Sequence, residues 1–573
     1  MKNDACQPFL FFWKEIFKTL VVLFFAFLSF SSSLYAQSNI DQAVRETDRL
    51  GTENLRDVLP PFPEAPPEIE MEKPPVQGGE AKFFIKKINL VDAESIPAEE
   101  FALLISQYEN RETTLTELNG LAKEIEQEYL KRGFIAAVFI PPQEVKEETI
   151  ALQVIEARMG ELQIEDHKYF KKSRLSYYWH IPPGEILRYD QMSKSIELMN
   201  KNSDREVKAV LHSGEEPGTS DVLLTPTTHF PVHLTSSFDN EGSVTTGRGR
   251  IGAGVRHNNF LGLDDMLILG ETFGKDFGSF YGYHSVPIGD QGASILYGYS
   301  FSIAEPKKDL TSSVVASKAK NSTVSIHQDL FNKGERYGEA FLGFDAKDKK
   351  ITTQQNTHSH DRLRIVSGGF SFNYTGQQST TYVKPALYQG INGLGARRQS
   401  TLTSREAGNT FTKFTLDFNH KHNIPFHLQT NAKFSGQLCN EKLTPQEELY
   451  LGGIDSVRGY PSGDFLADNG LQTNLELLIP AFFIPQGVKL PFDKNSLSDE
   501  ITLLTFYDYG YGIKRNPENT EGGSANMMSL GSGIRIRFYD KAIIRLEWGV
   551  PIADRSVTES GKTRFHFSVE NEF

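Results

Sequence analysis

The sequence has almost no cysteine. Cys6 and Cys439 are the only two cysteines among its 573 residues, and Cys6 lies in a segment that we expect to be removed from the mature chain. A single remaining thiol can form neither an internal disulfide nor a thiolate metal cluster. The sequence therefore predicts no disulfide framework, no metal and no other cofactor.

Positive charge and long apolar runs are also scarce. Lys and Arg total 60 against 73 Asp and Glu, a formal net charge of -13. This balance argues against nucleic acid as a partner, because phosphate contacts need clustered cations. After residue 36 no stretch approaches ~18 consecutive apolar residues, so no transmembrane helix is predicted. Serine-hydrolase, zinc-protease, P-loop and dinucleotide-binding motifs are absent, so nothing predicts an enzyme.

The first 36 residues have the pattern of a signal peptide. Lys14 and Lys18 precede an apolar run at 20–30, and small residues ending at Ala36 suit a cleavage site. This run is too short to span a bilayer comfortably. The alternative interpretation is an N-terminal membrane anchor that is not cleaved. We expect residues 1–36 to be removed and the chain to be exported. An exported chain without helical spans is either a soluble periplasmic protein or a β-barrel.

Two segments separate the predicted signal peptide from the first folded unit. Residues 37–59 contain no proline and carry mixed charge, which favours an N-terminal helix. Residues 60–79 are rich in Pro and Glu and end in Gly-Gly, a composition that cannot bury a core. We interpret residues 60–79 as an extended, semi-stiff linker.

Residues 80–228 have the mixed pattern of two small α/β units. Residues 80–157 predict a strand, two helices and two strands, in this order: FFIKKINLV, PAEEFALLISQYEN, LTELNGLAKEIEQEYLKRG, FIAAVFIP and TIALQVIEA. Residues 158–228 repeat this plan more loosely. The sequence therefore predicts two β-α-α-β-β domains in tandem, with a boundary near residue 157.

Beyond Phe230 the pattern changes to strict alternation of apolar and polar residues. One run places two kinds of side chain on opposite faces: Ile544, Leu546 and Trp548 against Arg545, Glu547 and Gly549. A packed sandwich core rarely tolerates full charges on one face, whereas a water-filled lumen does. A secreted all-β adhesin is the alternative.

Residues 229–573 are long enough for about 16 strands, at roughly 20 residues per strand and connection. We therefore predict a mixed fold class, in which two small α/β domains precede a 16-stranded antiparallel transmembrane β-barrel. The last strand ends in Phe573, and an aromatic terminus is what the barrel-assembly machinery commonly receives. The predicted location is the outer membrane of a Gram-negative bacterium, with outer-membrane lipid and that machinery as partners.

Four motifs carry a resemblance to a known family: YLKRGFIAAVFIPPQ (129–143), EPGTSDVLL (216–224), GGIDSVRGY (452–460) and FYDYG (506–510). With these motifs, residues 83–573 resemble the haemolysin and filamentous-haemagglutinin transporters of two-partner secretion, a branch of the outer-membrane assembly-factor superfamily. The resemblance implies an N-terminal helix, a linker, two POTRA domains and a 16-stranded barrel.

The resemblance also implies a loop, at 452–470, that folds back into the pore. Its VRGY motif and the strand motif F-x-D-x-G that receives it comprise these residues: Val457, Arg458, Gly459, Tyr460, Phe506, Asp508 and Gly510. A guanidinium group cannot lose its charge and offers a planar fork that a carboxylate can hold bidentately. We therefore expect Arg458 and Asp508 to hold the loop on the inner wall. Gly459 would allow a close turn, and Tyr460 could pack beside the guanidinium group.

The function that the resemblance implies is export of an unfolded partner protein to the cell surface, after recognition by the periplasmic POTRA domains. A sheet edge can bind an extended peptide, with a groove expected near Ile135, Val138 and Ile140. Residues 37–59 would plug the resting pore. The partner would be a large exoprotein, an adhesin or a cytolysin. A barrel-assembly insertase of the same superfamily and a passive porin are the alternatives.

Overall fold

The computed structural model describes residues 69–71 and 82–573, with gaps at 144–146, 217, 244–245, 306–313, 354–356, 486, 490–494, 518–521, 540 and 554–561. The predicted signal peptide and the predicted N-terminal helix lie outside the described residues. No helix in the described part of the chain is long and apolar enough to cross a membrane.

The first α/β domain has two small sheets and one long helix. Its elements are β2 (Lys82–Ile85), β3 (Lys87–Val91), η1 (Ala98–Phe101), α3 (Ala102–Ile105), β4 (Arg111–Thr114), α4 (Leu115–Lys131), β5 (Ala136–Phe139) and β6 (Thr149–Glu156). The sheet order is β3-β6-β5, and β2 pairs with β4. Thr114 and Glu117 form a capping box that fixes the start of α4.

Two details of this domain differ from the prediction. The run FFIKKINLV is broken at Lys86 into β2 and β3, because Ile85 and Ile88 both enter the same core although they are three residues apart. The first predicted helix is shorter than expected and consists only of η1 and α3. The break gives β2 a partner of its own, the short strand β4.

The second α/β domain has a four-stranded sheet covered by two helices. Its elements are β7 (Arg158–Ile164), α5 (Lys172–Tyr177), α6 (Tyr189–Met199), β8 (Arg205–Ser213) and β9 (Thr219–Thr228). The fourth strand is β1 (Ile69–Met71), which pairs in parallel with β8. This corrects the interpretation of residues 60–79 as linker alone, because the free edge of β8 offers backbone groups that an extended segment can pair with.

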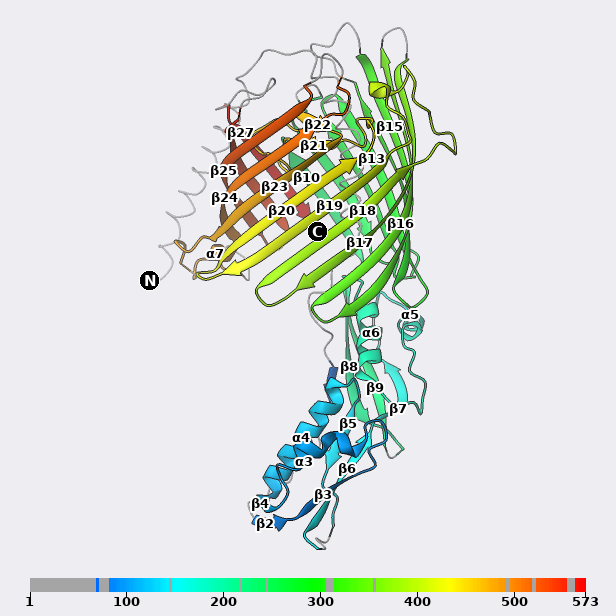
Figure 1. Ribbon diagram of the computed structural model, residues 1–573, viewed down its shortest axis with the longest axis vertical. Helices are drawn as coiled ribbons and strands as arrows, with labels where there is room; N and C mark the ends of the chain where they lie inside the picture. Colours follow the sequence, from blue (N-terminus) through cyan, green and yellow to red (C-terminus); the bar gives the residue numbers. More distant parts are fainter. Residues whose placement is uncertain are drawn as a thin grey trace, which may run out of the picture.

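The remaining strands close into one antiparallel barrel of 16 strands, as predicted. In barrel order they are β10 (Val232–Asp239), β11 (Arg250–His257), β12 (Met266–Gly274), β13 (Phe277–Ile288), β14 (Ala293–Ala304), β15 (Val314–Lys333), β16 (Arg336–Thr353), β17 (Thr357–Thr375), β18 (Ser379–Gly390), β19 (Thr412–Ile424), β20 (Leu428–Cys439), β23 (Asn469–Pro480), β24 (Ile501–Ile513), β25 (Ser524–Phe538), β26 (Ala542–Pro551) and β27 (Arg564–Glu572). Figure 1 shows the two α/β domains stacked below the barrel.

The alternation along the strands separates lipid from lumen. In β26, Trp548 is 50% exposed on the outer face, whereas Glu547 is 2% exposed on the inner face. The barrel closes where β27 pairs with β10. At that seam the N–H of Phe573 donates to the carbonyl of Leu234 at 2.9 Å. The terminal aromatic residue therefore extends the last strand pair to the end of the barrel that faces the α/β domains.

Candidate functional site

The connection between β20 and β23, residues 440–468, folds back into the lumen, and we call it the pore loop. It carries a two-stranded hairpin, β21 (Leu449–Leu451) and β22 (Phe465–Ala467). Val457 and Tyr460 at its tip are completely buried and pack against Met527 of the barrel wall. The loop is therefore packed on the wall and does not lie free in solvent.

Arg458 makes the central contacts of the tip. Its Nη2 lies 2.7 Å from Oδ1 of Asp508 and its Nε lies 2.9 Å from Oδ2, so the carboxylate holds the guanidinium bidentately, in the geometry expected from the sequence. Its Nη1 lies 2.7 Å from Oε1 of Glu476 and 2.8 Å from Oε2 of Glu547. One cation thus joins the loop to strands β23, β24 and β26.

Aromatic packing completes this contact. The guanidinium carbon of Arg458 lies 3.5 Å from the centroid of the Phe506 ring, a cation–π arrangement. We expected Tyr460 beside the guanidinium group, but Phe506 takes that place. The hydroxyl of Tyr460 instead donates to the carbonyl of Ala553 at 2.6 Å, so it holds the tip to the end of β26.

Glycines on both sides allow the loop to approach the wall closely. A Cβ on Gly459 would lie 2.6 Å from the backbone nitrogen of Pro551, and one on Gly549 would lie 2.7 Å from the carbonyl oxygen of Arg458. A Cβ on Gly510 would lie 2.8 Å from a methyl carbon of Val457. A side chain at Gly459 or Gly549 would meet backbone atoms and push the loop off the wall, whereas one at Gly510 would meet only side-chain methyl groups.

A second layer of polar groups fixes the partners of Arg458. Asp508 also accepts hydrogen bonds from Nδ2 of Asn474 at 2.9 Å and from the backbone N–H of Arg458 at 3.0 Å. Arg535 lies 2.8 Å from both Glu476 and Glu547. Sequence reasoning did not single out Glu476 and Arg535. The available signal was a charged residue between two apolar neighbours, as in Leu475-Glu476-Leu477 and Ile534-Arg535-Ile536.

The backbone of the tip has a partner too. Nε2 of His566 lies 2.7 Å from the carbonyl oxygen of Arg458, and its Nδ1 lies 3.1 Å from Glu241. His566 belongs to β27 and Glu241 follows β10, so both strands of the barrel seam contribute to holding the tip. Local sequence patterns contain no signal for this pair, because 325 residues separate its members.

The root of the pore loop is held by separate ion pairs. Glu447 lies 2.7 Å from Nζ of Lys347 and 2.6 Å from Nζ of Lys413. Burial alone would raise the pKa of Glu447, but the two ammonium groups lower it to about 2. Asp468 accepts a bond at 3.1 Å from Arg405, which belongs to the connection between β18 and β19. Root and tip are thus fixed independently.

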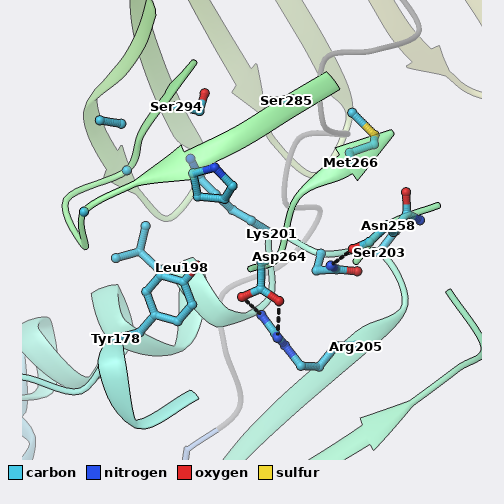
Figure 2. A pocket seen from close by; sticks show the side chains of 15 residues that line it. Tyr178, Leu198, Lys201, Ser203, Arg205, Asn258, Asp264, Met266, Ser285 and Ser294 are labelled. Carbon is cyan, nitrogen blue, oxygen red and sulfur yellow. Dashed lines mark hydrogen bonds and ion pairs between the residues drawn. The ribbon is translucent and has the colours of Figure 1, made fainter. Parts of the chain in front are cut away.

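The second α/β domain meets the barrel through a buried polar joint (Figure 2). Arg205 is fully buried and its two terminal nitrogens lie 2.7 and 3.1 Å from the carboxylate of Asp264 in the β11–β12 turn. A cavity of about 100 Å³ lies beside this pair. Burial would raise the pKa of the neighbouring Asp265, but hydrogen bonds from His284 and from backbone N–H groups keep it below its ordinary value. The carboxylate of Asp265 beside the joint is therefore ionised at neutral pH.

The three residues proposed to line a partner groove are not at the surface. Ile135 is 7% exposed and packs into the core of the second α/β domain, so it belongs to the joint between the two domains. Val138 is 6% exposed in the core of the first domain, and Ile140 is partly buried there. The exposed apolar side chains near the edge strand β5 are those of Phe139 and Ile155.

Two family models match the sequence. The family described as "Haemolysin secretion/activation protein ShlB/FhaC/HecB" matches residues 218–536, and "POTRA domain, ShlB-type" matches residues 83–157. The chain belongs to this family. It is a two-partner secretion transporter of the outer membrane, whose POTRA domains lie in the periplasm. The members of the family are transporters.

Two outer-membrane transporters match this chain along most of its length. The transporter is 22% identical to the heme/hemopexin transporter protein HuxB of Haemophilus influenzae, over 86% of this chain and 87% of that protein. It is 21% identical to the outer membrane transporter CdiB of Dickeya dadantii, over 80% and 82% of the two chains. The solved structure of CdiB from Escherichia coli aligns with a TM-score of 0.69 at 18% identity, over 95% of this chain and all of that one. These matches do not favour the insertase and porin alternatives.

Proposed function

We propose that the transporter exports one unfolded partner protein, which binds first to the POTRA domains and then passes through the barrel lumen beside a displaced pore loop. The observation that carries this proposal is the position of the loop tip. Arg458 is 2% exposed inside the barrel and contacts three strands of its wall. A loop that occupies the lumen at rest must move before a polypeptide can pass.

The receptor surface in this proposal is the edge of the first POTRA sheet. β5 is an edge strand. The backbone N–H of Val138 in β5 donates to Glu126 of α4 at 2.9 Å, so a side chain occupies a position that an added peptide strand could take. Phe139 and Ile155, 38% and 36% exposed, offer apolar contact beside this edge. Val138 itself supports the surface from within the core.

Residues 37–59 complete the proposal as a plug of the resting pore. This role follows from the family resemblance and from the helical pattern of that segment, which lies outside the described residues. The energy for export is proposed to come from folding of the partner outside the cell, because a folded chain cannot return through the lumen.

The experiment is an export assay in a heterologous Gram-negative host that makes the transporter and its partner, which we expect to be a large exoprotein encoded beside it. The partner should reach the medium only with the transporter present. Phe139→Ser should lower export several-fold, whereas the control Leu103→Ser, at an 85% exposed position away from β5, should not. Free passage of small solutes without export of the partner would indicate a passive porin and contradict the proposal.

A further inference from the structure

Three adjacent strands extend beyond the rest of the barrel rim at its extracellular end. β15, β16 and β17 are 20, 18 and 19 residues long, whereas their neighbours β14 and β18 have 12 residues each. β18 ends at Gly390, opposite Ile365, and β17 continues from there to Thr357. Figure 1 shows these strands rising on the right of the barrel. Their outer face is therefore presented above the neighbouring wall.

The outward-facing side chains in the middle of these strands are apolar. Val324 and Ile326 of β15 are 39% and 51% exposed, Leu342 of β16 is 61% exposed, and Val366 of β17 is 37% exposed. The alternate positions on the other face are polar and buried, Ser325 and Ser367 among them. This arrangement marks the lipid-facing band of this part of the wall.

Directly beyond the apolar band, the same outer face becomes basic. We call this set the basic patch: Lys318, Lys320, Lys350, His360, Arg362 and Arg364. The strand register aligns five of its members in two rows. Lys318 lies opposite Lys350 and Lys350 opposite His360, while Lys320 and Arg362 both lie opposite Asp348; Arg364 lies in the next row, opposite Ala346. Residues opposite one another in a sheet point to the same side.

The charges of the basic patch are poorly balanced by the protein. Asp348 is the acidic residue in these rows, and its carboxylate is bound by Arg364 at 2.7 Å. Lys318, Lys320, Lys350 and Arg362 have no carboxylate within 4.0 Å among the described residues. Like charges directly opposite each other destabilise a sheet. An external anion would relieve this repulsion.

The height of the patch fits the layer of lipid headgroups. Lys320 is four residues beyond Val324, and Arg362 is four residues beyond Val366. Four residues span about 13 Å along a strand, which corresponds to about 9 Å of height at a tilt near 45°. The polar headgroup region begins at the edge of the hydrocarbon core and is roughly 5–8 Å thick on each side. The backbone of Lys320 and Arg362 thus lies at the outer edge of this layer, and their long side chains can extend back to the headgroup phosphates.

We propose that the basic patch binds the phosphate groups of a phosphorylated glycolipid in the outer leaflet. Arginine offers a planar fork that matches a phosphate, and the lysines add point charges around it. The bound lipid holds the long strands β15 to β17 in place on the side of the barrel away from the seam between β27 and β10. This binding is separate from export of the partner protein.

The test measures lipid binding to the full-length transporter in phosphatidylcholine nanodiscs that contain diphosphoryl lipid A. The patch variant Lys318→Gln/Lys320→Gln/Lys350→Gln/Arg362→Gln should bind lipid A at least about tenfold more weakly than the wild type, as expected for the loss of four charges near a phosphate layer. The control Lys82→Gln/Lys86→Gln/Lys87→Gln/Lys123→Gln removes the same charge from exposed positions of the first POTRA domain and should bind like the wild type. Heat-modifiable mobility on gels checks that every barrel is folded.

Two further probes separate the possible sources of the phosphate. Dephosphorylated lipid A should bind the wild type at least about tenfold more weakly than the diphosphoryl form. Inorganic phosphate should not displace bound lipid A at millimolar concentration, and displacement would assign the patch to free anions and overturn the lipid assignment. Equal binding of lipid A by the wild type and the patch variant would overturn the proposal altogether.

Discussion

Arg458 joins the pore loop to three strands through one guanidinium group, and this is the densest set of charge contacts at the site. Two guanidinium groups, those of Arg458 and Arg535, face the three carboxylates of Asp508, Glu476 and Glu547. A buried ion cluster of this kind is weak evidence for net stability, but it makes removal of one partner costly. Its physical role is to define one position for the loop.

Arg458→Ala should therefore impair export far more than barrel assembly. The substitution leaves three carboxylates facing one remaining guanidinium, a change that typically costs about 3–5 kcal/mol in a buried pair. We expect at least a tenfold loss of exported partner, with folded transporter near the wild-type amount. Export assays and heat-modifiable gels measure the two quantities. Unchanged export would show that the tip contact has no part in the transport cycle.

Glu447 gives the root of the loop a defined pH dependence. Its pKa in the folded protein is about 2, below the value near 4.3 of an unperturbed glutamate. A lowered pKa stabilises the fold above the unfolded value, and this contribution disappears as the pH falls through the folded value. Glu447→Gln should lower the unfolding temperature at pH 7, and the difference from the wild type should shrink between pH 4 and pH 2. Thermal unfolding in detergent tests this, and a difference independent of pH would contradict it.

Strand β26 has a glycine, Gly549, at the point where the backbone of the pore loop comes closest. Gly549→Ala would place a methyl group 2.7 Å from the carbonyl oxygen of Arg458, a contact that forces the tip to shift. Gly278→Ala in β13 is a matched control, because its Cβ has 3.9 Å to the nearest atom. We expect Gly549→Ala to make the pore loop sensitive to protease and Gly278→Ala to leave it protected. Equal protection of both variants would show that the wall tolerates the methyl group.

The elements also show what sequence patterns can predict. Period-two alternation predicted the barrel correctly, because every second residue of runs such as 544–549 meets either lipid or the lumen. The tip contact between Arg458 and Asp508 followed from two motifs and the chemistry of a planar fork. His566 and strand β1 were missed, because their partners lie far away in the sequence and only the closed barrel or the folded sheet brings them together. Glu476 was missed because it belongs to neither motif, although it lies only 18 residues from Arg458.

Ile135 and Val138 were wrongly predicted to lie at an exposed groove, also because sequence patterns do not show which distant segments pack together. Ile135 and Val138 lie in a strand-like run that predicts apolar positions but not which domain covers them. In the fold, the second POTRA domain packs on Ile135, and Tyr189 donates its backbone N–H to the carbonyl of Gly133 at 2.8 Å. The predicted helical stretch at 97–110 was likewise too long, because local propensity does not include the turn that lets β4 pair with β2.

At the scale of the whole molecule, the two joints arrange the POTRA domains in series with the barrel. The buried pair of Arg205 and Asp264 fixes the second domain to the periplasmic turn between β11 and β12. Ile135 fixes the first domain to the second. A partner bound at β5 therefore lies on a framework that leads toward the periplasmic mouth of the barrel (Figure 1).

Deletion of residues 37–59 tests whether this segment plugs the resting pore. If this segment occupies the resting pore, its removal should raise the conductance of single transporters in planar bilayers, because one obstruction of the lumen is then absent. A variant with residues 37–59 replaced by a Gly/Ser segment of equal length serves as a control for linker length. Unchanged conductance in both variants would remove the plug from the account.

The proposed export route requires the loop tip to leave the wall, and a reversible cross-link between the two tests this requirement. In a Cys439→Ser background, Val457→Cys and Gly510→Cys suit a disulfide, since a Cβ at position 510 would lie 2.8 Å from a methyl carbon of Val457, close to the ~3 Å between a Cβ and the partner sulfur in a disulfide. Export is expected to stop when the pair is oxidised and to resume after reduction, whereas oxidant should not change export by the single Val457→Cys variant. Full export with the disulfide intact would contradict it.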